Sequence, residues 1–116
     1  MTTVVIVVLL AAVVLALTPL PFPRSPGDAA GRALAAVHGV PLIYWRPGCT
    51  FCVRMRLALG RRGGRAVWVD VSRDREAALR VRSVNGGNET VPTVFVGEES
   101  RTNPSPAWVR EHLPAS

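Results

Sequence analysis

Two cysteines are the residues of this chain best suited to chemistry. Cys49 and Cys52 lie three positions apart in the stretch YWRPGCTFCVRMR, residues 44–56, and they are the only cysteines among 116 residues. The pair falls where an apolar run ends and a helical pattern begins, which favours thiol–disulfide redox chemistry over a stapled secreted framework. Half of a metal site and a pair of unreactive core cysteines are the alternatives.

A zinc site within the chain is the weaker interpretation. Zinc takes about four ligands, and beyond the cysteines the candidates are His38, His112 and carboxylates with no paired spacing. Cys49 also follows a Gly/Pro turn and does not lie on an apolar face, which argues against a purely structural pair. We therefore expect no metal site.

The position of each thiol in the expected helix predicts its role. Cys49 stands at the helix start, where unpaired backbone N–H groups and the positive end of the helix dipole stabilise an anion such as a thiolate. The charge of Arg46 acts in the same direction. Cys52, one turn further on, shares a face with Met55 and Leu59 and should point inward. An outer sulfur that attacks and an inner sulfur that resolves is the arrangement needed for thiol–disulfide exchange.

A second candidate element is the motif NETVPTVFV, residues 88–96. Pro92 precedes a strand pattern, cannot donate to a sheet, and can follow a cis peptide bond. The backbone of Val91 could then stay unpaired and bind an extended substrate. By pattern alone, the motif is equally compatible with an ordinary strand start.

The remaining pattern predicts the elements that position these motifs. An Ala-rich helix begins near Asp28 and stops at Gly39, and Ser72 and Asn103 are expected to cap two later helices. The order is helix, β, α, β, α, β, β, α, which indicates a compact α/β domain with a small mixed four-stranded sheet. The expected strands are residues 40–45, 66–71, 93–96 and 101–102, and the later helices are 49–60, 72–84 and 104–113.

The N-terminal segment is uncharged and apolar, and Val4–Leu17 is an unbroken hydrophobic run. It approaches the length of a membrane span, about 17 to 20 residues, only if Thr2, Thr3 and Thr18–Leu20 are included. We interpret residues 1–20 as a transmembrane helix, with a secretory signal segment or a core helix as alternatives. The helix would be followed by a Pro-rich linker, residues 21–27, and a domain, residues 28–116.

Charge predicts both the orientation of this segment and the class of partner. All basic residues follow the apolar run, so the positive-inside rule predicts a single-pass, membrane-anchored protein with its catalytic domain in the cytoplasm. The fourteen basic residues, all arginine, exceed the eight acidic ones, which gives a net charge of +6. The arginines are scattered and are not interleaved with aromatic residues, so nucleic acid is not expected as a partner.

Three motifs together resemble one known family. Cys49-Thr-Phe-Cys52 after a strand, Thr90-Val91-Pro92 before the third strand, and TNPS at residues 102–105 are similar to a glutaredoxin. The stretches SVNGGNETVPTVFV and TNPS are most similar to the mycoredoxin branch, which serves bacteria that use mycothiol. The resemblance covers roughly residues 40–113 and implies a thioredoxin-like, glutaredoxin-type, three-layer fold.

The resemblance also implies an activity: reduction of mixed disulfides between proteins and a low-molecular-weight thiol. Cys49 would be the nucleophile, and Cys52 the resolving or dispensable thiol. Val91 and a cis-Pro92 would form the platform for the bound disulfide. Arg46, Thr90 and Asn103 are further candidates for substrate binding. The dipeptide Thr50-Phe51 between the cysteines departs from the Pro-Tyr and Gly-Tyr of relatives, which leaves redox potential and thiol preference open.

These implications define the expected partners. No cofactor is expected to be bound, and mycothiol or glutathione would act as co-substrate beside mixed-disulfide protein clients. The chain would be a monomer. Two other functions remain open: an exported dithiol oxidoreductase, and a metal or iron–sulfur carrier that uses Cys49 from two chains.

Overall fold

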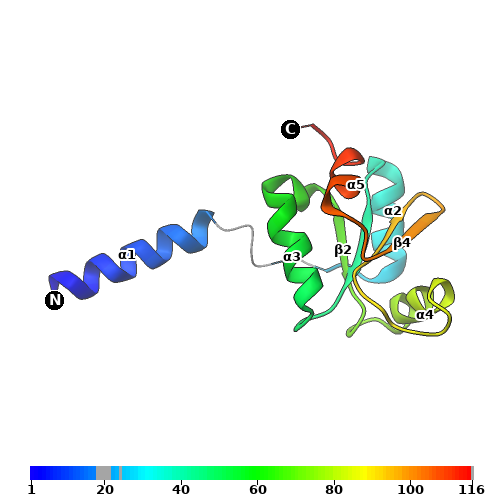
Figure 1. Cartoon of the computed structure of the whole chain (residues 1–116), viewed down its shortest axis with the longest axis horizontal. Helices are drawn as coiled ribbons and strands as arrows, with labels where there is room; N and C mark the ends of the chain where they lie inside the picture. The colour runs from blue at the N-terminus through cyan, green and yellow to red at the C-terminus, as the bar shows by residue number, and fades with distance from the viewer. Residues whose placement is uncertain (18–21, 24, 116) are drawn as a thin grey trace.

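A four-stranded mixed sheet forms the centre of the molecule in the computed structural model, which describes residues 1–17, 22–23 and 25–115 (Figure 1). The strand order is β2-β1-β3-β4, with β1 parallel to β2, β3 antiparallel to β1, and β4 antiparallel to β3. The elements along the chain are α1 (Thr2–Leu17), α2 (Asp28–His38), β1 (Leu42–Trp45), α3 (Thr50–Leu59), the 3-10 helix η1 (Gly60–Arg65), β2 (Val67–Asp70), α4 (Arg75–Val84), β3 (Thr93–Val96), β4 (Glu99–Thr102) and α5 (Pro106–Glu111).

Alternation of side chains along the central strands builds two hydrophobic layers, one on each face of the sheet. Leu42 and Tyr44 of β1 pack in a cluster with side chains of α2 and α4. Ile43, between them in sequence, packs in a second cluster with side chains of α3 and α5. The result is the three-layer α/β arrangement that the sequence predicts, with two helices on each face of the sheet (Figure 1).

Helix starts differ from the sequence prediction at two places. Asp74 caps α4, because its side chain accepts hydrogen bonds from the N–H groups of Glu76 and Ala77, whereas Ser72 is bonded to Asp70 in the preceding turn. Ser105 caps α5, because its hydroxyl oxygen accepts a hydrogen bond from the N–H of Trp108 at 3.2 Å. Asn103 has a φ of 45° and lacks the extended backbone of a helix cap. Local sequence allowed several caps, and the path of the chain from the preceding strand selected one.

The expected transmembrane helix is not supported. Helix α1 has 16 residues, so it is about 24 Å long, whereas a hydrocarbon core is about 30 Å thick. No helix in the described residues is both long and apolar enough to cross a membrane. The prediction also counted Thr18–Leu20, which lie outside the described residues. Because no described helix can cross a membrane, the expectations of a single-pass anchor and of a localisation derived from it are wrong.

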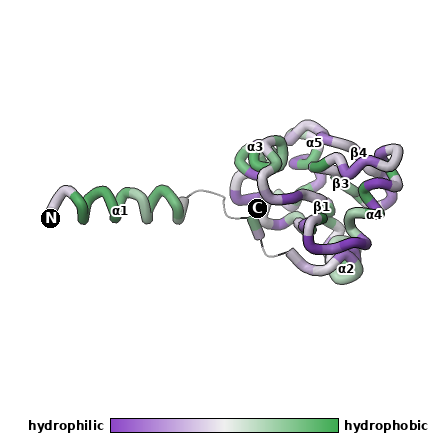
Figure 2. The backbone as a smooth tube through the Cα atoms, turned by 90° about the horizontal axis from the view of Figure 1, so that it is seen from below, coloured by the Kyte–Doolittle hydropathy of each residue, from purple (hydrophilic) through white to green (hydrophobic). Residues whose placement is uncertain are grey.

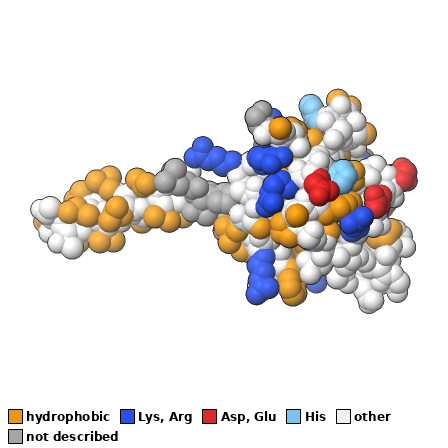
Figure 3. Space-filling model, turned by 45° about the horizontal axis from the view of Figure 1, so that its top comes forward, with side chains coloured by type: hydrophobic (Ala, Val, Ile, Leu, Met, Phe, Trp, Pro, Cys, Tyr) orange, Lys and Arg blue, Asp and Glu red, His pale blue; other side chains and the backbone are white. Residues whose placement is uncertain are grey.

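Helix α1 lies apart from the domain (Figure 2), and hydrophobic side chains cover the face of it that Figure 3 shows. Closer to the domain, the segment that follows packs on the sheet. The Phe22 ring stacks on Trp45 at a centroid distance of 4.0 Å, and the Ser25 hydroxyl accepts a hydrogen bond from the Asp70 N–H at 2.8 Å. The bond to Ser25 satisfies the Asp70 N–H on the edge strand β2, where unpaired N–H groups would otherwise be free.

Helix α2 approaches β2 at Gly31, which gives a test of the packing. A Cβ at this position would lie 2.8 Å from Cγ2 of Val69, a fully buried side chain. Gly31→Ala should therefore lower the free energy of unfolding by about 1–3 kcal/mol, although alanine is the better helix former. Urea denaturation measures the change. If the clash is the cause, Gly31→Ala should cost less in the Val69→Ala background than in wild type, as a double-mutant cycle shows. A Gly31→Ala protein more stable than wild type would contradict the close approach.

Candidate active site

Cys49 lies in the connection between β1 and α3. The strand ends at Trp45, a short turn follows, and Gly48 takes the left-handed backbone conformation, with a φ of 81°, that glycine adopts most readily. Cys49 is the cap residue of α3, and its Sγ accepts a hydrogen bond from the Cys52 N–H at 3.2 Å. A sulfur at this position receives the backbone donors and the dipole of the helix start, which is the electrostatic setting that a thiolate needs.

Cys52 has the opposite environment. Its side chain is fully buried and belongs to the same cluster as Tyr44 and Val91. Burial, with a smaller contribution from the hydrogen bond to Cys49, raises the pKa of the Cys52 thiol to about 12. Cys49 is half-buried, and both cysteines are free thiols in this structure. The two sulfurs are therefore unequal, with one accessible at the helix start and the other protonated at neutral pH and inaccessible.

The Val91–Pro92 turn faces Cys49 from a segment 42 residues further along the chain. The Cys49 thiol donates to the carbonyl oxygen of Val91, with 3.5 Å between sulfur and oxygen. The peptide bond between Val91 and Pro92 is cis, and both residues are buried. The carbonyl oxygen of Pro92 accepts a hydrogen bond of 2.7 Å from the N–H of Asn103. The antiparallel pairing of β1 with β3 brings the two motifs together.

The other residues singled out from the sequence lie around this centre, with different contacts. Arg46 is exposed in the turn before Cys49. Thr90 is exposed, and its carbonyl oxygen accepts a hydrogen bond from the Thr93 hydroxyl at 2.7 Å. Asn103 is exposed at the end of β4 and joins the centre through its backbone. The structure places these three residues at the rim, and their contact with a substrate stays a prediction.

Sequence reasoning missed Asn85. The stretch NGGN predicts only a turn, but the Asn85 side chain donates to Thr93 Oγ1 at 3.0 Å and to the carbonyl oxygen of Val81 at 2.9 Å. An asparagine directly after a helix is a known helix-ending signal, but its bond to Thr93 depends on how α4 lies against the sheet. Nothing local in the sequence could have predicted that bond.

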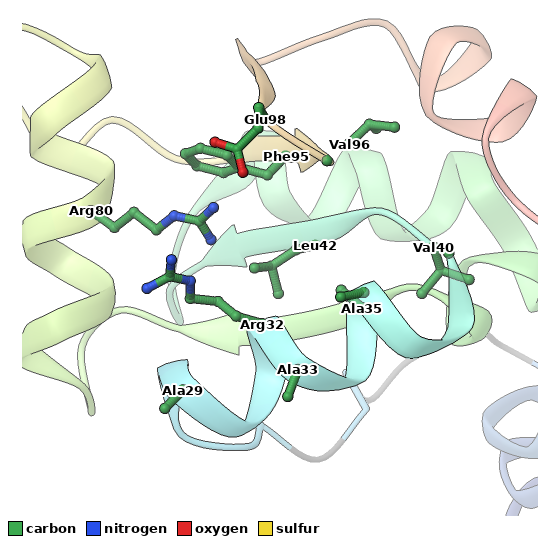
Figure 4. Close-up of a pocket in the computed structure, with 13 residues that line it drawn as sticks. Ala29, Arg32, Ala33, Ala35, Val40, Leu42, Arg80, Phe95, Val96 and Glu98 are labelled. Carbon is green, nitrogen blue, oxygen red and sulfur yellow. The ribbon is translucent and has the colours of Figure 1, made fainter.

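The pocket in Figure 4 is a different place. It lies between α2 and α4, with Leu42 and Phe95 among its lining and with neither cysteine. Among residues 1–17, 22–23 and 25–115, no group of three or more His, Cys, Asp and Glu side chains is arranged to hold a metal ion.

A half-exposed thiol at a helix start, a buried thiol one turn further on, and an X-Pro turn opposite define a thiol–disulfide oxidoreductase of the thioredoxin-like class. The glutaredoxin family model matches residues 42–101, from β1 into β4. The chain belongs to the glutaredoxin family.

Two curated relatives agree with this assignment. Both are proteins of Mycobacterium tuberculosis, from strains CDC 1551 and H37Rv, that carry the name "putative glutaredoxin". Each is 43% identical to this chain over 72 residues, which is 61% of this chain and 86% of the relative. As a member of this family, the chain is a thiol–disulfide oxidoreductase.

The inequality of the two thiols predicts selective alkylation. At pH 8, a thiol with a pKa of about 12 is ionised in roughly one molecule in ten thousand, and Cys52 is also shielded from reagent. Iodoacetamide should therefore modify Cys49 and leave Cys52 free in the folded protein, as read by peptide mass spectrometry. Both should react in guanidinium chloride, which serves as control. Equal labelling of the two cysteines in the folded protein would show that Cys52 is not shielded.

Proposed function

We propose that this glutaredoxin reduces mixed disulfides between proteins and a low-molecular-weight thiol by a monothiol mechanism centred on Cys49. The observation that carries the proposal is the inequality of the two sulfurs. Cys49 accepts a backbone hydrogen bond at the helix start, whereas burial keeps the Cys52 thiol protonated. A thiol that is neutral and buried is a poor attacking group, so the first exchange falls to Cys49.

The reaction has two exchanges. The Cys49 thiolate attacks the small-thiol sulfur of the mixed disulfide, which forms a bond between Cys49 and the small thiol. The client protein leaves as a thiolate and takes up a proton. A second small-thiol thiolate then attacks the small-thiol sulfur of this intermediate, which releases an oxidised small-thiol dimer and restores the Cys49 thiolate. Each cycle consumes one free small-thiol molecule, because the other half of the oxidised dimer comes from the mixed disulfide itself.

The backbone of Val91 is suited to align the substrate for the first exchange. Its carbonyl oxygen lies 3.5 Å from Cys49 Sγ, so a disulfide bound along this edge would bring a sulfur to the nucleophile. The exposed side chains of Thr90 and Asn103 border the same edge, and Arg46 lies on the Cys49 side. We assign contact with the small thiol to these three residues.

Mycothiol is the small thiol that we favour, with glutathione as the comparison. The support is the likeness of SVNGGNETVPTVFV and TNPS to mycoredoxins. The dipeptide Thr50-Phe51 between the cysteines departs from that branch, so the comparison of the two thiols belongs in the test.

The test measures release of a labelled small thiol from a mycothiol–protein mixed disulfide by the full chain. Cys49→Ser should reduce the rate to the uncatalysed level, because no attacking sulfur remains. Cys52→Ser should keep at least about a third of the wild-type rate, because the second small thiol resolves the intermediate. The matched glutathione mixed disulfide should react about tenfold more slowly.

Each other outcome has a definite meaning. Loss of activity in Cys52→Ser would replace the monothiol route by a dithiol route through a Cys49–Cys52 disulfide. An equal rate with both small thiols would remove the assignment of mycothiol but keep the mechanism. An active Cys49→Ser protein would overturn the whole proposal.

A further inference from the structure

The side chain of Asn85 joins three segments behind the Val91–Pro92 turn. Its amide nitrogen donates to the carbonyl oxygen of Val81 in α4 and to the hydroxyl of Thr93 at the start of β3. Its amide oxygen accepts a hydrogen bond from the hydroxyl of Thr102 at the end of β4. Both amide hydrogens and the amide oxygen are therefore engaged, so the side chain is held in one orientation.

Thr93 carries this constraint to the turn. Its side chain is fully buried, and its hydroxyl accepts from Asn85 at 3.0 Å while donating to the carbonyl oxygen of Thr90 at 2.7 Å. The Thr90 carbonyl belongs to the planar peptide unit that leads into Val91. Holding this carbonyl therefore fixes the direction of the backbone as it enters Val91.

The end of β4 holds the other side of the turn. The N–H of Asn103 donates to the carbonyl oxygen of Pro92 at 2.7 Å, and the neighbouring Thr102 is the residue bonded to Asn85. The peptide units before Val91 and after Pro92 are thus tied to the same strand end. Between these two ties, the Val91 carbonyl oxygen lies 3.5 Å from Cys49 Sγ.

The left-handed backbone of the turn after α4 comes from other residues than Asn85. Gly86 and Gly87, with φ values of 60° and 94°, supply the left-handed backbone themselves. Asn88, in the same NGGN stretch, donates through its backbone to the Asn85 carbonyl, and its side chain forms no hydrogen bond in the part of the chain that the structure describes. Of the three side-chain bonds of Asn85, one closes the end of α4 at Val81 and the other two reach β3 and β4.

We propose that Asn85 is a positioning residue for disulfide exchange, which acts through Thr93 and Thr90 to hold the Val91 backbone at a fixed distance from Cys49. The inference rests on the proposed role of Val91 as a substrate platform. Disulfide exchange needs three sulfurs nearly in line, so it is sensitive to a small displacement of the platform. Alkylation of Cys49 by iodoacetamide needs no platform and should be insensitive to it.

The experiment compares the full-chain wild type, Asn85→Ala and Asn88→Ala in two reactions of Cys49. One is exchange with dithionitrobenzoate, in which the thiolate forms a mixed disulfide and releases one coloured thiolate; the other is alkylation by iodoacetamide. Asn85→Ala should slow exchange about tenfold and change alkylation by less than about twofold. Asn88→Ala should leave both rates within about twofold of wild type.

A second pair of variants tests the path through Thr93 and serves if Asn85→Ala folds poorly. Thr93→Val keeps the shape of the buried side chain but removes the hydroxyl, so it should slow exchange as Asn85→Ala does. Thr93→Ser keeps the hydroxyl and should restore at least about half of the wild-type exchange rate. Melting temperatures of all variants are measured in parallel.

Two outcomes would overturn the inference. In one, exchange and alkylation fall together, which would show that Asn85 only stabilises the fold. In the other, Asn85→Ala exchanges as fast as wild type. The probe contains no biological small thiol, so the result does not depend on the choice of mycothiol. A wild type that exchanges with the probe but does not release mycothiol or glutathione would contradict the proposed function alone.

Discussion

The antiparallel pairing of β1 with β3 is the constraint on which the site depends. In this register Tyr44 lies opposite Thr93, so the end of β1 lies beside the start of β3. The chain leaves β1 towards Cys49 and enters β3 from Val91–Pro92, which places the nucleophile and its platform at the same end of the two central strands. Segments that are 42 residues apart in sequence meet for this reason alone.

Burial of side chains on both faces of the sheet fixes this strand register. A slip of one residue would exchange the side chains of the two hydrophobic layers, so that Ile43 would face α2 and α4 in place of Tyr44. Hydrogen bonds also hold Tyr44 on its face of the sheet, because its buried hydroxyl donates to Asp28 at 2.5 Å and accepts from Arg80 at 2.8 Å. Burial, and secondly the bond to Asp28, raises the pKa of Tyr44, so the hydroxyl stays protonated.

Inequality of the two thiols follows from helix geometry. A spacing of three residues places Cys49 at the cap and Cys52 one turn inside, where the helix packs on the sheet. One sulfur is thereby given backbone donors and partial exposure, and the other is enclosed in the core. The Asn85 network then orders the opposite side of the site, so that both partners of the exchange lie on supported backbone.

The sequence by itself determined much of this protein, because the relevant signals are local. The Cys49–Cys52 spacing, the runs of β-branched residues and the Thr90-Val91-Pro92 motif predicted the redox site, the four strands and the glutaredoxin family. Tertiary structure decided what depends on distant partners: the caps at Asp74 and Ser105, and the bonds that Asn85 makes to α4, β3 and β4. Helix α1, at 16 residues, is shorter than the span that the apolar run had suggested. Composition reports hydrophobicity, but the partner of a polar side chain is set by the fold around it.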